Sequence, residues 1–304
     1  FDSLVVHSSY ETGIKTLSIR SNELDAVVRG EFDVESLPAA FKYFLHRYYP
    51  ENIPAPVNDI GNQAFSFDIT TRNIEPYIPL IIPELSGFQN SHISGSLHTL
   101  DNKMELKAEV PYFSYQQYAF SDAVINASGD IQRLVLTGDL GNVQISDSLQ
   151  LPRTSLRLES SNGISDITIN TSATQAINNA SLAARVETFS DGLKIIFQPS
   201  NFVLNGKTWS IQQGGELEFR RNSVTQGELL LSESNQQIRL RTVPSGIGNW
   251  NDVEVTLEQV NLGDITIGRA RFEPGWSWEK CVKPLVKTDS CQAPHTQYII
   301  SGRI

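Results

Sequence analysis

The residues that could carry chemistry stand close together near the end of this 304-residue chain. They are Asp289, Ser290, Cys291 and His295. A cysteine and a histidine form a nucleophile–base pair only where the fold brings them together and a third group orients the histidine. A turn that contains a packed cysteine is the simpler interpretation. Cys281 and Cys291 could also form a disulfide in an oxidising compartment, but their spacing fits no zinc template.

The remaining histidines and the glycine-rich segments give no second candidate. His46 adjoins charged and aromatic neighbours, while His7, His92 and His98 are isolated, with no spacing suited to shared metal ligation. The glycines of residues 138–141 predict a hairpin turn, because no strand–loop–helix context for phosphate binding surrounds them. We therefore expect no catalytic residues, no metal site and no cofactor, and interpret the chain as a non-enzyme.

Composition and charge exclude several other classes of protein. Hydrophobic residues make up 39%, enough for a substantial core, and the net charge is -10 without any basic cluster, which argues against nucleic-acid binding. An acidic surface is also repelled by anionic headgroups. No apolar run is long enough for a membrane-spanning helix. The chain opens at Phe1 without a methionine or a signal pattern, so we expect it to be part of a longer protein.

Alternation of apolar and polar side chains is the dominant pattern, and it predicts antiparallel strands with one dry and one wet face. The clearest examples lie at residues 104–110, 155–159, 166–170, 216–220, 237–241 and 254–258. Turn signals separate these segments at short intervals. The sequence therefore predicts an all-β fold, either a meandering sheet, a sandwich or a solenoid.

One stretch is helical in character. Residues 37–49 have the spacing of an amphipathic helix, with Ser36 as the expected N-cap and Pro50 as its end. Its apolar stripe includes Leu37, Phe41, Phe44, Leu45 and Tyr48. We expect this stripe to pack against the sheet edge or to cover the mouth of a groove. A second, proline-interrupted helix is expected around residues 77–85.

Residues 1 to about 263 resemble the AsmA-like superfamily, in particular proteins of the translocation and assembly module B type. The resemblance depends on the order of several segments: Gly30–Asp33 before the helix, then Phe65–Ile69, Ile74–Phe88, Ile93–Leu97, Val203–Trp209 and Glu216–Phe219. It implies an elongated, curled antiparallel sheet with an apolar inner groove. It also implies a periplasmic protein anchored in the inner membrane, which transports phospholipids or assists an outer-membrane β-barrel assembly protein.

Under that resemblance, the dry faces of the strands form a trough for phospholipid acyl chains. The candidate groove residues are Leu106, Leu156, Leu158, Ile167, Ile169, Leu217 and Phe219, and we expect all of them to face one interior. Phe41, Phe44 and Leu45 are the expected packing face of the helix.

Residues about 261–304 resemble the opening part of a small cupin domain. The matching segments are Asn261–Trp278, Val282–Pro284, Thr288–Thr296 and Ser301–Arg303. Cys281 stands where cupins usually have a histidine, and His295 has no second histidine beside it, so a working metal site is not expected. The alternative function is a small-molecule-binding or metal-dependent cupin enzyme with a β-rich extension. The two resemblances meet at Val260–Asp264, which indicates a natural fusion, a chimera or a designed junction.

Overall fold

The computed structural model describes residues 3–146, 149–172, 177–204, 206–211, 214–221, 227–245, 251–258, 260–262, 265–267, 277–281 and 283–288. The chain divides into two compact units, Phe1–Ile267 and Gly268–Ile304. The described part of the second unit contains two helical turns, α3 (Trp278–Cys281) and α4 (Lys283–Val286).

The first unit is all-β, as the alternating pattern predicts. Its strands up to β10 are β1 (Leu4–Glu11), β2 (Ile14–Ser21), β3 (Leu24–Glu31), β4 (Ala64–Thr71), β5 (Leu85–Gly87), β6 (His92–His98), β7 (Lys103–Tyr115), β8 (Tyr118–Gly129), β9 (Leu134–Ser146) and β10 (Leu149–Ser161). Those that follow are β11 (Ile164–Thr171), β12 (Ile177–Phe189), β13 (Gly192–Phe197), β14 (Ser200–Leu204), β15 (Lys207–Ile211), β16 (Glu216–Arg220), β17 (Glu228–Glu233), β18 (Gln236–Pro244), β19 (Asn251–Glu258), β20 (Val260–Leu262) and β21 (Ile265–Ile267).

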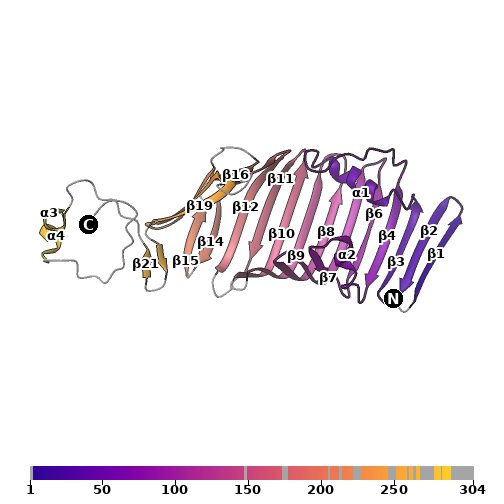
Figure 1. Cartoon of the computed structure of the whole chain (residues 1–304), viewed down its shortest axis with the longest axis horizontal. Coiled ribbons are helices and arrows are strands. Elements are labelled where there is room, and N and C mark those ends of the chain that lie inside the picture. The colour runs from indigo at the N-terminus through magenta and orange to yellow at the C-terminus, as the bar shows by residue number, and fades with distance from the viewer. Residues whose placement is uncertain are drawn as a thin grey trace. The chain divides into compact units, whose positions relative to one another are not determined.

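Within the described residues, β1 to β19 form one long, open, antiparallel sheet (Figure 1). Neighbouring strands in the sequence are mostly neighbours in the sheet, so the chain meanders from β1 to β12. The short β5 is an exception, because it pairs beside β6 with the far end of β7. β20 and β21 form a separate hairpin. Of the three architectures that the sequence allowed, the meandering open sheet is the one observed.

A line of bends crosses the long central strands. Regular pairing is interrupted at Pro111 in β7, Asp122 in β8, Gly141 in β9 and Arg153 in β10, which face one another across the sheet. Asp122 and Arg153 have φ angles of 50° and 45°. In β12 the pairing with β14 shifts by one residue at Asn179, which has a φ angle of 50° and extends the line of bends into this strand. We call these five positions the bend line. Pairing keeps the same register across the first four, whereas Asn179 is an extra residue of the kind that bends a strand and re-aims side chains.

The hairpin turn predicted at residues 138–141 is wrong, because these residues lie inside strand β9. A Cβ atom on Gly138 would lie 3.9 Å from Cβ of Leu156, an ordinary contact distance. Gly141 is a bend-line residue whose missing side chain leaves room for Asp122. Both glycines therefore have roles within the sheet, which a turn signal read from sequence does not distinguish.

Helix α1 (Leu37–His46) connects β3 to β4, and helix α2 (Ile78–Ile81) lies between β4 and β5 in the sequence. Helix α1 ends before the predicted Tyr49, and the chain continues in turns to Ile53. Ser36 occupies the N-cap position, but its side chain does not cap the helix. Instead the Ser36 amide and hydroxyl donate hydrogen bonds to Oδ2 of Asp33, at 3.1 Å and 2.8 Å. Helix α2 is a single turn inside the proline-interrupted segment.

Candidate functional site

The apolar side chains of the central strands share one face of the sheet. Residues that pair directly in an antiparallel ladder point to the same side. One cross-strand row consists of Leu106, Ala127, Leu136, Leu158, Ile167, Ala184 and Phe197. The next row consists of Ile93, Ala108, Ile125, Gly138, Leu156, Ile169 and Leu182. We call this side of the sheet the dry face.

All seven candidate groove residues lie on the dry face. Leu106, Leu158 and Ile167 belong to the first row, and Leu156 and Ile169 to the second. The other two reach the same side through a third set of pairs. Leu217 pairs with Ile195, Ile195 with Val186 and Val186 with Ser165, which is two residues from Ile167; Phe219 is two residues from Leu217. Contact of these side chains with lipid stays a prediction.

Helix α1 covers the dry face at β3 to β9. Phe44 is 1% exposed and packs in a buried cluster with Phe65, Leu97 and Met104. Phe41 contacts the rings of Phe65 and Phe67, with centroids 6.1 Å and 6.0 Å apart. Leu45 packs against the same cluster. The predicted packing face of the helix therefore lies on the face of the sheet rather than at its edge.

Residues 47–53, which follow α1 and which we call the strap, are held along one margin of the dry face. The hydroxyl of Tyr48 donates to the backbone carbonyl of Asp130, between β8 and β9. The amide of Gly163, in the β10–β11 turn, donates to the Tyr48 carbonyl at 2.6 Å. Asn52 Nδ2 donates to the Phe189 carbonyl at the end of β12, at 3.5 Å. The strap thus follows the ends of successive strands from β8 to β12.

A buried cluster of hydroxyls fixes the middle of the strap to the sheet. The Tyr49 hydroxyl lies 2.6 Å from Oγ of Ser160 and 3.2 Å from Oγ of Ser165, and the two serine oxygens are 2.8 Å apart. Ser160 and Ser165 are 1% and 3% exposed. Each buried hydroxyl therefore has a partner, as buried polar groups require. Sequence reasoning missed these contacts because the serines are more than a hundred positions from Tyr49 along the chain.

The opposite margin of the dry face is formed by the strand ends beyond the bend line. Phe113, Phe120, Val143 and Leu151 form one cross-strand row there. The Phe113 and Phe120 rings stack with centroids 4.6 Å apart. Phe113 also packs against the buried cluster around Val110 on the dry face. The bend line therefore brings the row that contains Phe113 to the dry face, where it forms an apolar wall along this margin.

Between the strap and this wall, the dry face over β9 to β13 is only half-buried. The residues of this section, which we call the trough floor, are Leu136, Leu156, Leu158, Ile167, Ile169, Leu182, Ala184 and Phe197. They are aliphatic or aromatic and contiguous, whereas soluble proteins rarely expose continuous apolar patches without a binding role. This apolar floor lies between the strap at one margin and the row from Phe113 to Leu151 at the other, and we call the whole arrangement the trough.

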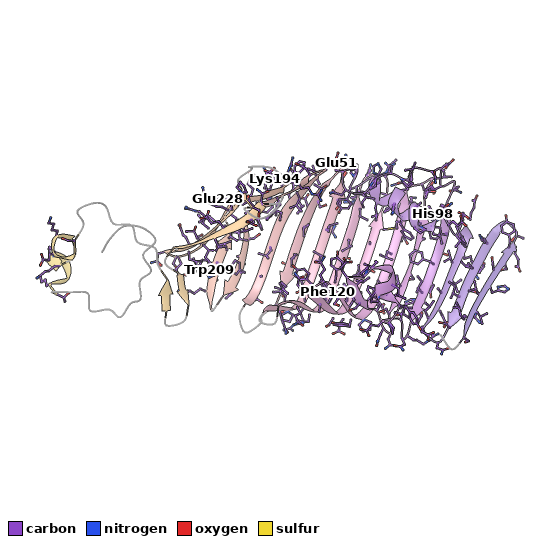
Figure 2. The ribbon with its side chains drawn as sticks, viewed as in Figure 1. Glu51, His98, Phe120, Lys194, Trp209 and Glu228 are labelled. Carbon is purple, nitrogen blue, oxygen red and sulfur yellow. The ribbon has the colours of Figure 1, made fainter. Side chains whose placement is uncertain are left out.

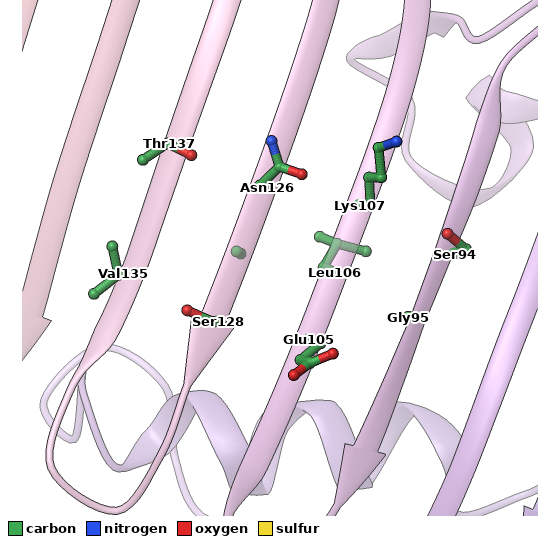
Figure 3. Close-up of a pocket in the computed structure, with 10 residues that line it drawn as sticks. Ser94, Gly95, Glu105, Leu106, Lys107, Asn126, Ser128, Val135 and Thr137 are labelled. Atoms are coloured by element: carbon green, nitrogen blue, oxygen red, sulfur yellow. The ribbon is translucent and has the colours of Figure 1, made fainter.

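The opposite side of the same strands is polar. A shallow depression on it is lined mainly by Ser94, Glu105, Lys107, Asn126, Ser128 and Thr137 (Figure 3). None of the residues lining this depression is a histidine, cysteine or aspartate. The adjacent pairing of Lys107 with Glu109, at 3.0 Å, lowers the pKa of the Glu109 carboxyl below its usual range. This face carries exposed ion pairs, which stabilise little.

His92 is not isolated, as the sequence suggested, because its Nε2 lies 2.9 Å from Oδ2 of Asp68 on the neighbouring strand. Both side chains are about half exposed, at 46% and 61%. Ser94 pairs directly with Asp68 in the sheet. A histidine–carboxylate pair acts as a base in catalysis when a nucleophile contacts the imidazole. The described contacts of His92 include no serine hydroxyl, so the arrangement is that of a solvent-exposed hydrogen-bonded pair.

The cluster of possible catalytic residues that the sequence contains lies near the end of the chain. Asp289, Ser290, Cys291 and His295 all lie outside the described residues, as does most of the cupin-like segment. Among the residues that the structure describes, no group of three or more His, Cys, Asp or Glu side chains is placed to hold a metal ion. The described helices include none with the length and apolar character needed to cross a membrane.

Comparison with known proteins adds no assignment to this geometry. No family model matches the chain, and neither the curated proteins nor the solved structures give a significant match.

Proposed function

We propose that the trough floor binds phospholipid acyl chains and that the protein is a non-catalytic lipid-handling scaffold. The observation that supports this proposal most strongly is the continuity of the floor. Leu136, Leu158, Ile167, Ala184 and Phe197 follow one another across five strands with no polar side chain between them. All of them are half-buried.

Contact between an acyl chain and an apolar surface is strongly favourable, because it removes methylene groups from water. Exposing one methylene to water costs about 0.8 kcal/mol, so a chain of about 14 methylenes costs roughly 11 kcal/mol. An apolar floor bounded on one side by the row from Phe113 to Leu151 removes part of that cost without any nucleophile or metal ion. The hydroxyls of Tyr49, Ser160 and Ser165 bond to one another, so they need no polar group from a ligand.

The setting that we propose for this function is the periplasm. There the protein would be part of a larger, inner-membrane-anchored molecule that carries phospholipid or assists an outer-membrane β-barrel assembly protein. This setting follows from the resemblance to the AsmA-like superfamily. The acidic charge of the chain, -10, argues against nucleic acid as a partner.

A displacement assay tests the proposal on the intact chain. A fluorescent fatty acid is bound first, and unlabelled phosphatidylethanolamine or phosphatidylglycerol is added as competitor. Ile167→Glu places a carboxylate on the trough floor and should lower probe affinity at least tenfold. Thr168→Glu, on the same strand but the opposite face beside Arg157, is the matched control and should leave affinity unchanged. Equal affinity of the two variants, with both folded by circular dichroism, would exclude binding on the dry face.

A further inference from the structure

The sheet divides into two branches beyond β12. The second half of β12, from Ala184 to Phe189, pairs with β13, whereas the first part pairs with β14. The first branch continues from β13 to β16. The second continues from β14 through β15 and β17 to β18 and β19. Side chains on the dry face of one branch can therefore meet those of the other.

The two branches enclose a buried apolar cluster at this end of the trough. Its buried members are Leu217 of the first branch and Ile211 and Leu229 of the second, which are 8%, 6% and 4% exposed. The partly buried side chains packed around them are Leu182, Phe197, Phe202, Phe219, Leu231 and Leu240. We call this set the end cluster. Leu182 and Phe197 belong both to the trough floor and to the end cluster, so the floor leads directly into it.

The backbones of the two branches also touch. A Cβ atom on Gly227, just before β17, would lie 2.5 Å from the Glu216 carbonyl oxygen and 2.8 Å from Cα of Leu217. The Gly227 amide donates to Oγ1 of Thr242 at 2.7 Å, and Gly227 accepts from the Thr242 amide at 3.0 Å. β16 is therefore held directly against the start of β17.

A second contact joins the branches nearer their ends. The amide of Arg220 in β16 donates to Oδ1 of Asn251 at the start of β19, at 2.8 Å. Figure 1 shows β16 and β19 converging at this end of the sheet. Protein interiors are packed about as densely as organic crystals, so an acyl chain would have to displace these side chains to pass between the branches.

We propose that the trough is blind at the end cluster, so that it holds one acyl chain with its terminal methyl group against Leu217 and Leu229. This inference rests on the acyl-binding function proposed above and specifies it: the site accommodates a chain of limited length and does not conduct lipid past β13. The polar end of the ligand then lies away from the end cluster, on the half-buried part of the floor. Affinity should rise roughly fourfold for each added methylene until the floor is filled, and should then level off.

Trp209 provides a reporter at the blind end. It lies in β15, is 2% exposed, and stacks on Phe202 of the end cluster with ring centroids 6.5 Å apart (Figure 2). Replacing the other three tryptophans, Trp250, Trp276 and Trp278, by phenylalanine leaves Trp209 as the single emitter. Two stearates are compared as quenchers, one carrying a nitroxide near its methyl end and one carrying it near its carboxylate.

The methyl-end label should quench Trp209 more strongly than the carboxylate-end label at equal occupancy of the protein. Equal quenching, or stronger quenching by the carboxylate-end label, would overturn the blind-end proposal while leaving acyl binding intact. Failure of both stearates to displace a fluorescent fatty acid from the unmodified chain would instead overturn the proposed function, and the blind-end proposal with it.

The dependence of affinity on acyl-chain length gives a second test, which uses the full-length protein. Leu229→Ala enlarges the end cluster by removing a buried side chain, so the chain length at which affinity levels off should increase. Leu230→Ala is the matched control, because Leu230 is adjacent in β17 but pairs with Arg239 on the other face. A shift in Leu229→Ala alone supports the blind end. Identical length profiles in the unmodified chain and both variants would contradict it.

Discussion

The side chain of Asp122 in β8 lies directly beside the backbone of Gly141 in β9. A Cβ atom on Gly141 would be 2.8 Å from Oδ2 and 2.9 Å from Cβ of Asp122, closer than side-chain packing permits. Asp122 itself has a φ angle of 50°, a conformation that costs free energy in residues other than glycine. The two residues together form the centre of the bend line, which separates the trough floor from its second wall.

Gly141→Ala should therefore destabilise the protein by about 1–3 kcal/mol, because a methyl group overpacks the site beside Asp122. Gly138→Ala in the same strand is the control, since its nearest neighbours would be 3.9 Å and 4.0 Å away, an ordinary contact distance. Urea unfolding measures both free energies.

Asp122→Gly removes the obstructing side chain and adopts the positive φ without strain. Combined with Gly141→Ala, it should recover most of the lost stability, which makes the two changes non-additive. Strict additivity of the two free-energy changes would show that Asp122 and Gly141 are not in contact.

Phe44→Ala should cost about 3–5 kcal/mol of stability, because Phe44 is 1% exposed at the centre of the interface between α1 and the sheet. Tyr43→Ala is the matched control; Tyr43 is the preceding residue, 41% exposed, and its loss should change stability by less than about 0.5 kcal/mol. A cost below about 1 kcal/mol for Phe44→Ala would mean that the helix does not contribute to the stability of the sheet.

The stability of the protein should fall with pH in the alkaline range because of Tyr48 in the strap. Burial, and next the negative charge of Asp130, raise the pKa of Tyr48 from 10.0 to about 12. Because the folded state holds this proton more tightly, its contribution is complete below pH 10 and is lost as the pH rises to about 12. Tyr48→Phe should flatten this part of the stability profile. Tyr112→Phe, at a tyrosine 46% exposed, should leave the profile unchanged; equal flattening by both would contradict the assignment.

The sequence predicts the strands and their faces well, because period-two alternation is a local signal. Leu106, Leu158 and Ile167 are assigned to the dry face from their own neighbours alone, and pairing in the sheet places them there. The amphipathic helix is also predictable, except for its last turn. Ser36 does not cap that helix because Asp33 already binds the Ser36 amide and hydroxyl.

The bend line and the strap contacts could not be predicted in the same way. Asp122 and Arg153 adopt positive φ angles without being glycine; aspartate tolerates this conformation in many contexts, and arginine gives no local signal for it. Pro111 is a local trace of the bend, because a proline within a strand marks an edge or an irregularity. Val110 and Phe113, three residues apart, pack in the same cluster, as a bend between them requires. The partners of Tyr48 and Tyr49 depend on pairing between strands far apart in sequence, which the pattern of a single segment does not determine.

Photocrosslinking tests the central claim, that lipid occupies the dry face of β9 to β13. A benzophenone amino acid replaces Ile167 in one protein and Thr168 in another, and each is incubated with vesicles of radiolabelled phosphatidylethanolamine and phosphatidylglycerol. Ile167 points to the dry face and Thr168 to the wet face. The account predicts a strong lipid adduct from position 167 and almost none from position 168. Equal labelling at the two positions, or labelling only at 168, would contradict it.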